Sequence, residues 1–370
     1  MTSSTLSFIN MDSPVTLHSA RSHSSNQVEK PKDQRHVQMD GGARAWATLL
    51  GGFCVTTATF GYVNSFGVYQ DVYTRSHAAS ASSISWIGST QIFFLMAMGL
   101  LSGKLLDIGY FKQTTFVGSV IFVFSIFMVS IAHHDKYYQL YLCQGLGMGI
   151  GAGLLYVPAM AIQTHYWRSR RALAMGIVIT GTSAGGIIFP IMLNQLFKGS
   201  AGFAWGVRIS AFICLGLLIL GNILMTTNPE VLAEGKPKPD IKAIVTDVPY
   251  MICSIGGFFP DGDIIDFYLQ LFSILHGVDS NIAFYTLAIM NAAAIPGRVL
   301  PNILADKLGP INVIIPAVFG CAVLVFAIFG VKSAATAIVF AILYGFFSGA
   351  WLSLCSPVVA SFSIHPSESG

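Results

Sequence analysis

The sequence predicts an all-α integral membrane protein with about ten membrane-spanning helices. Apolar residues make up 54% of the 370 residues and charged residues only 10%, whereas a soluble domain carries about 25% charged residues. A soluble chain of this composition would expose apolar patches that soluble monomers avoid. The apolar residues also form runs of about 20 residues, the length that spans a bilayer as a helix. Because strands with open edges leave backbone groups unpaired in hydrocarbon, we expect helices surrounded by a lipid bilayer.

The candidate spans are these apolar runs, taken in order along the chain. Short polar loops separate them, except between the sixth and seventh, where residues 227–246 contain Pro229, Pro237 and Pro239. We interpret this segment as a hinge between two halves. The candidate spans lie near 46–69, 85–106, 114–133, 138–164, 172–195, 205–226, 247–273, 282–304, 311–330 and 334–361.

The predicted domain organisation follows from these spans. Residues 1–40 are rich in Ser, His, Gln and Lys and lack an apolar core, which predicts a disordered cytosolic tail rather than a signal peptide. Residues 41–227 are expected to form a six-helix bundle, 228–246 a cytosolic linker, and 247–370 an incomplete second bundle of four helices. With the tail in the cytosol, three quarters of the 20 lysines and arginines fall on the cytosolic side, which supports this orientation.

An internal repeat relates the two halves. Asp107 and Asp306 are 199 residues apart, and so are Pro158 and Pro357, each of which follows a glycine-dense stretch. The glycines indicate close helix packing, and same-direction repeats of six spans are typical of two-halved transporters. The first half supplies six spans and the second only four, so this symmetry predicts two helices beyond the tenth.

Several groups of residues form recognisable motifs. They are Gly103–Lys112 between the second and third spans, Asp40–Trp46 before the first span, Tyr166–Gly176 opening the fifth span, and Phe284–Asn291, Gly297-Arg298 and Ala305-Asp306 in the second half. Together they resemble the major facilitator superfamily and, within it, the fungal type of the monocarboxylate-porter branch, over about residues 40–370. The resemblance implies a two-bundle transporter that rocks between inward-facing and outward-facing states.

Two aspartates lie in corresponding loops of the repeat. The resemblance implies that the loop with Gly103 and Asp107 docks against an eleventh span and helps to hold the outward-facing arrangement, and a simple helix cap is the alternative. Asp306 mirrors Asp107. We expect Asp306 to meet the N-terminal end of the fifth span, where the helix dipole favours a carboxylate.

Arg298 lies in the eighth candidate span, and ionisable residues within spans are strong functional signals. The resemblance implies an arginine here that pairs with an anionic substrate, because its fork binds a carboxylate through two hydrogen bonds. The alternative is an arginine near the mouth of the span whose side chain snorkels to water. Asn64 and Ala294 stand where animal monocarboxylate carriers have a lysine and an aspartate. These departures count against proton-coupled lactate transport and favour other solutes, such as vitamins and secondary metabolites.

Asp261, Asp263 and Asp266 lie in the seventh candidate span. A single acid at the centre of a span costs about 2.5–3.5 kcal/mol, so three acids indicate a water-filled cavity and a role in proton coupling. The alternative is a helix broken within residues 256–260, with the acids in a wet outer half.

Polar side chains within the spans are the remaining candidates for a binding site. A cavity between two helical bundles needs a few such groups to orient a ligand. We expect Asn64, Gln91, Asn291 and Arg298 to bind the substrate, and helix–helix hydrogen bonds are the alternative role for such side chains.

The leading functional hypothesis is secondary active transport of a small organic solute, a monocarboxylate-like anion or a fungal secondary metabolite, across the cell membrane. The alternative is a truncated, non-transporting or regulatory membrane relative. An enzyme is not indicated, because no HExxH motif or paired His/Asp cluster lies within a span. The six cysteines lack the spacing of a disulfide framework or metal site, and no cofactor is expected. A net charge of +3 does not indicate a nucleic-acid partner. The expected partners are the bilayer, the solute and, as a candidate coupling ion, the proton.

Overall fold

A computed structural model describes residues 40–77, 79–133, 136–228 and 279–362 of the chain, together with residues 246, 251, 269 and 272. Within these residues every regular element is a helix, and eight helices are long and apolar enough to cross a membrane. The predicted all-α membrane fold is therefore confirmed. The positions that lie outside the described residues include the tail up to residue 39, residues 229–245 of the linker, and Asp261, Asp263 and Asp266.

The second to sixth predicted spans are present, with their ends shifted by a few residues. The fourth is composite, because a π-helical segment interrupts it near its start and a 3-10 turn ends it. It comprises α6 (Tyr137–Leu140), the π-helix η1 (Tyr141–Gly147), α7 (Met148–Ala161) and the 3-10 turn η2 (Ile162–His165). The other four are α4 (Ala81–Asp107), α5 (Phe111–Ile131), α8 (Arg171–Lys198) and α9 (Gly202–Leu224).

The first predicted span, expected as one helix over 46–69, is interrupted twice. It consists of α1 (Ala43–Ala58), α2 (Phe60–Val63) and α3 (Phe66–Arg75), with Thr59 in the first gap and Asn64 and Ser65 in the second. Hydroxyl side chains bind backbone carbonyls at both gaps: Thr59 donates to Val55 O at 2.7 Å, and Ser65 donates to Tyr62 O. Such bonds compete with the helical backbone bonds and bend helices.

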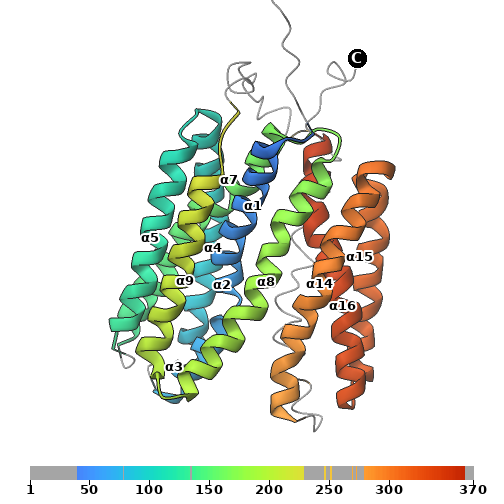
Figure 1. Cartoon of the computed structure of the whole chain (residues 1–370). Helices are drawn as coiled ribbons and strands as arrows, with labels where there is room; N and C mark the ends of the chain where they lie inside the picture. The colour runs from blue at the N-terminus through green and yellow to red at the C-terminus, as the bar shows by residue number, and fades with distance from the viewer. Residues whose placement is uncertain are drawn as a thin grey trace, which may run out of the picture. The chain divides into compact units, whose positions relative to one another are not determined.

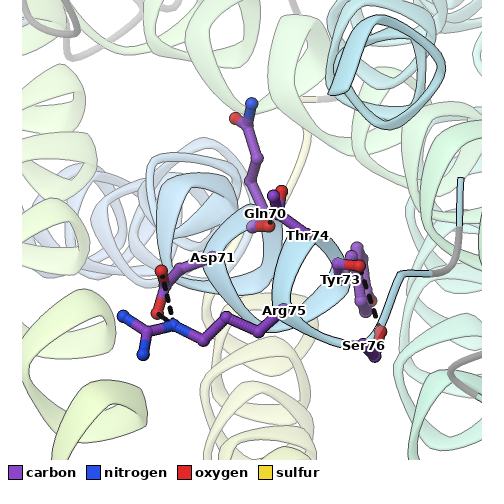
Figure 2. A network of polar contacts seen from close by, with 6 residues as sticks. All are labelled: Gln70, Asp71, Tyr73, Thr74, Arg75 and Ser76. Carbon is purple, nitrogen blue, oxygen red and sulfur yellow. Dashed lines mark hydrogen bonds and ion pairs between the residues drawn. The ribbon is translucent and has the colours of Figure 1, made fainter. Parts of the chain in front are cut away.

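The C-terminal end of α3 carries a local network of polar contacts (Figure 2). Arg75 pairs with Asp71 one turn earlier, with its Nε 2.9 Å from Oδ1. Ser76 donates a hydrogen bond to the carbonyl of Tyr73 at 3.0 Å. An exposed pair at this spacing contributes about 0.3–0.5 kcal/mol. The network therefore stabilises the end of the helix only slightly and does not determine where the span is placed.

Buried tyrosines hold the interrupted first span in place. The hydroxyl of Tyr62 lies 2.5 Å from that of Tyr69 and 2.9 Å from Oγ of Ser210 in α9. Tyr73 donates to Oε1 of Gln144 in η1 at 2.6 Å. Because a buried hydroxyl is costly unless it is hydrogen-bonded, these partners are specific anchors. They tie α2 and α3 to two other spans.

Glycines in the fourth span allow the neighbouring helices to approach closely, as predicted. A Cβ added to Gly151 would lie 2.7 Å from the backbone nitrogen of Phe122 in α5. A Cβ added to Gly153 would lie 2.7 Å from the carbonyl oxygen of Leu95 in α4. Only glycine fits at either position, so the fourth span packs tightly between α4 and α5.

The described part of the second half contains three long helices. α14 packs against α16 through glycines of both: a Cβ at Gly297 would strike the carbonyl oxygen of Phe346, and one at Gly345 would strike that of Met290. α15 packs beside α16. These elements are α14 (Ser280–Leu308), α15 (Pro310–Ala327) with the 3-10 turn η3 (Ile328–Gly330), and α16 (Ala334–Phe362).

Helix α8 lies between the first span and α14 (Figure 1), and it contacts both. On one side Thr56 donates to Val178 O at 2.6 Å, and a Cβ at Gly61 would lie 2.7 Å from Cα of Gly185. On the other side a Cβ at Gly176 would lie 2.8 Å from Nδ2 of Asn302 in α14. A binding site between the first span and α14 would therefore include residues of α8.

Candidate functional site

Asp40 binds the segment that precedes α8. Its Oδ1 accepts hydrogen bonds from the backbone N–H groups of Arg168 and Ser169 at 2.8 Å and of Arg170 at 3.3 Å. Partial burial opposes ionisation of this carboxyl, but the N–H donors outweigh it and hold the pKa of Asp40 below its ordinary value. The residue adopts φ 66°, a left-handed conformation that aspartate tolerates better than most residues.

Asp306, near the end of α14, binds the first turn of α8. Its Oδ1 accepts from the N–H of Ala172 at 2.9 Å, and its Oδ2 accepts from the N–H of Leu173 at 3.0 Å. These N–H groups have no partner within their own helix, and the helix dipole favours a negative charge there. The contact expected between Asp306 and the N-terminal end of the fifth span is thus present.

Gly103 and Asp107, the other conformational candidates, lie in the last turns of α4. Asp107 is the exposed final residue of this helix. Among the described residues, a Cβ at Gly103 would meet only Val157, at 3.9 Å, so their packing does not require a glycine here. The docking role that the resemblance implies for this loop stays a prediction.

Arg298 is buried between α14 and α8, with 6% of its surface exposed. It lies ten residues before the end of α14, which corresponds to about 15 Å along the axis. Its Nη1 donates to the carbonyl of Ile179 at 2.7 Å and to the hydroxyl of Thr182. The guanidinium is therefore directed at the middle of α8, which favours the interior position over snorkelling toward a helix end.

The side chains of Asn64 and Asn291 both approach Gly186 of α8. A Cβ added to Gly186 would lie 2.9 Å from Nδ2 of Asn64 and 2.9 Å from Oδ1 of Asn291. Asn64 lies in the turn that forms the second gap of the first span, directly after α2, and Asn291 lies two turns before Arg298 in α14. The fold therefore brings together three of the four residues that the sequence predicts to bind substrate.

Gln91, the fourth, lies elsewhere. It is buried with 1% of its surface exposed, and its Nε2 lies 3.7 Å from Sδ of Met148 in α7. Within the described part of the chain its Oε1 has no hydrogen-bond partner. These contacts place Gln91 in the packing between α4 and α7.

Two aromatic residues complete the group, and neither is among the four residues that the sequence predicts to bind substrate. The rings of Phe60 in α2 and Tyr156 in α7 are 5.4 Å apart and inclined by 39°. Tyr156 also lies within electrostatic range of the Arg298 guanidinium. We call these six residues the interior ring: Phe60, Asn64, Tyr156, Gly186, Asn291 and Arg298.

The segment Gly181–Gly185 has the pattern GxSxG, which in one class of hydrolases carries a nucleophilic serine. That motif needs a sharp turn from strand to helix to expose the hydroxyl. Here Ser183 lies inside the continuous helix α8 and is fully buried. The serine is therefore a packing residue, and its glycines face the first span.

An apolar helical protein with a buried arginine and amide side chains gathered between its spans is typical of membrane transport proteins. The family model of the Major Facilitator Superfamily matches residues 48–370. The chain belongs to this superfamily, and it is a multi-pass membrane protein of a family of transporters rather than of enzymes.

Curated relatives narrow the comparison to fungal proteins. The aspyridones efflux protein of Emericella nidulans is 41% identical over 340 residues, which cover 90% of this chain and 68% of the relative. The agnestins efflux protein of Paecilomyces divaricatus is 36% identical over 321 residues, covering 86% and 73%. A transporter of the same superfamily from Aspergillus flavus is 36% identical over 347 residues, covering 90% and 76%. The narrower monocarboxylate-porter branch stays a prediction.

Proposed function

We propose that this protein is a secondary active transporter that carries a small organic anion, of the secondary-metabolite kind, across the cell membrane by alternating access. The observation that carries the proposal is the buried Arg298, directed at α8 from a membrane-spanning helix. A buried charge in a span is costly and is retained for function. Arginine provides a planar fork that suits a carboxylate or an acidic enol.

The other polar members of the interior ring would bind a second group of the same solute. Asn64 and Asn291 each carry both a donor and an acceptor, so they suit a neutral hydroxyl, carbonyl or amide. They come from the first span and from α14, which belong to the two predicted bundles, 41–227 and 247–370. A ligand held between them would contact both bundles, as alternating access requires.

The two carboxylates at the start of α8 support a closed arrangement at that end. Asp40 and Asp306 bind the segment from Arg168 to Leu173 from the two halves of the chain. With the N-terminus in the cytosol, this is the cytosolic end, and opening it would separate Asp306 from α8. Gly103 and Asp107 are the proposed counterpart in the first half.

The proposal also includes the direction of transport and the ion that drives it. Two relatives are named as efflux proteins, which supports export. Asp261, Asp263 and Asp266 are the proposed proton-coupling residues, and they lie outside the described part of the chain.

Flux in proteoliposomes tests the proposal. The purified chain is reconstituted, a proton gradient is imposed, and uptake of a panel of carboxylates and acidic fungal metabolites is measured. We expect saturable flux of at least one anion, with Arg298→Ala reducing kcat/KM by at least tenfold because a charged hydrogen bond contributes about 1.5–3 kcal/mol. Arg208→Ala is the matched control. Arg208 lies near the start of α9, with its Cζ 5.1 Å from the centroid of the Trp205 ring.

Unchanged flux of every anion in Arg298→Ala would remove the anion assignment. A folded protein that carries no compound at all would favour the alternative, a regulatory or non-transporting relative.

A further inference from the structure

We propose that the interior ring selects flat, aromatic or conjugated acids, and that Phe60 and Tyr156 are the residues that determine this selectivity. The inference rests on the proposed function and deepens it, because it names the body of the substrate rather than its charged group. Phe60 and Tyr156 form a tilted pair with ring centroids 5.4 Å apart. Aromatic rings prefer such offset or edge-on neighbours at 4.5–7 Å.

The position of Tyr156 distinguishes it from the core aromatic residues of the same bundle. Tyr62, Tyr69 and Tyr73 are fully buried, and their hydroxyls have hydrogen-bond partners on neighbouring spans. Tyr156 is only half-buried, and nothing in the described residues is seen to hydrogen-bond its hydroxyl. A tyrosine that keeps exposed surface while its ring contacts Phe60, within electrostatic range of Arg298, has a face available to a ligand.

The ring also sets the length of a matching ligand. Phe60 and Asn64 are one helical turn apart, with the N–H of Asn64 3.2 Å from the carbonyl oxygen of Phe60. On the facing helix, Arg298 and Asn291 are two turns apart, about 10 Å along the axis. The aromatic pair therefore lies at the arginine end of the ring, and the asparagines lie at the other end.

A suitable solute consequently has three parts in a fixed order. An anionic group would bind Arg298, a flat ring next to it would pack on Phe60 and Tyr156, and a polar substituent would reach Asn64 and Asn291. A saturated, puckered body of equal size would lose the face-to-edge contact, which contributes about 2- to 10-fold in affinity for an aromatic pair.

A comparison of two matched acids tests this inference. 3-Phenylpropionate and 3-cyclohexylpropionate carry the same carboxylate on bodies of similar size, and only the first is flat. Flux of each is measured in proteoliposomes for the wild type, Tyr156→Leu, Tyr156→Phe and Phe60→Leu. Tyr141→Leu is the control, because Tyr141 lies in the same span but accepts a hydrogen bond from Thr90 at 3.1 Å. Thermal unfolding of each purified variant checks that it is folded.

We expect the wild type to favour the phenyl acid by about 2- to 10-fold in kcat/KM. Tyr156→Leu and Phe60→Leu should abolish this preference, while Tyr156→Phe and Tyr141→Leu should retain it. Equal flux of the two acids in the wild type, or a preference that survives both leucine variants, overturns the inference and leaves anion transport standing. If neither acid is carried and Arg298→Ala changes no flux, the proposed function fails and the inference fails with it.

Discussion

Asp40 and Asp306 bind backbone N–H groups in one short stretch of chain, from Arg168 to Leu173, although they lie far apart in the sequence. Asp40 precedes the first span, and Asp306 is near the end of α14. Of these two carboxylates, Asp306 joins the second half of the chain to the first, whereas Asp40 makes its contacts within the first half. The two aspartates therefore predict different consequences when they are replaced.

Asp306→Ala should shift the protein toward the arrangement in which α14 and the start of α8 are separated. Two hydrogen bonds at a helix N-terminus contribute about 1–2 kcal/mol, so the closed population should fall roughly 5- to 30-fold relative to the open one. Distances between spin labels on Lys307 and Arg168 measure the change. Asp71→Ala, which removes only an exposed pair on α3, should leave the distance distribution unaltered.

Asp40→Asn should lower stability at neutral pH, by about 1 kcal/mol or less. The pKa of Asp40 is lowered in the folded protein, so its stabilising contribution is present above the unfolded pKa of about 3.9 and is lost as the pH falls through the folded pKa. The difference in unfolding temperature between wild type and variant should therefore shrink below about pH 4. A difference that does not change from pH 7 to pH 3 would contradict this account.

Gly186→Ala should impair transport more than it impairs folding. Its Cβ would lie 2.9 Å from the side chains of both Asn64 and Asn291, so the two amides must move apart, at a cost of about 1–3 kcal/mol. Flux is compared with that of Gly216→Ala in α9, where an added Cβ would have none of the described residues within 4 Å. The control should retain wild-type flux and gain up to about 1 kcal/mol of stability, since alanine favours helix.

Tyr62→Phe should destabilise the protein by about 1–3 kcal/mol, because it leaves the buried hydroxyls of Tyr69 and Ser210 without this partner. Ser210→Ala should be less than additive with it, and a double-mutant cycle on thermal unfolding measures the coupling. Full additivity of the two changes would show that the hydroxyls do not stabilise the interrupted span as one network.

Gln91→Leu should leave flux unchanged and be neutral or slightly stabilising. Gln91 packs against Met148 rather than in the interior ring, and within the described residues its Oε1 has no partner. Replacing a buried, partly satisfied amide by an apolar group of similar shape removes a desolvation cost. A clear loss of flux in folded Gln91→Leu protein would show that Gln91 does contribute to substrate binding.

Hydropathy was sufficient to predict most of the spans, because a bilayer demands long apolar helices whatever else the protein does. It failed at the first span, expected as one helix and found in three pieces. Thr59 and Ser65 change the backbone there through side-chain bonds to Val55 and Tyr62. A mean hydropathy over about 20 residues contains no information about such local hydrogen bonds.

The sequence by itself determined that this is an all-α membrane protein, and it placed Asn64, Asn291 and Arg298 among the candidates for the site. The sequence separation of these three residues does not predict which side chains lie close together in the folded protein. Only the tertiary structure decided that both asparagines lie against Gly186, that Gln91 packs between α4 and α7, and that Phe60 pairs with Tyr156 within electrostatic range of Arg298. The physical reason is that burial in lipid depends on composition, whereas a binding site depends on which helix faces pack together.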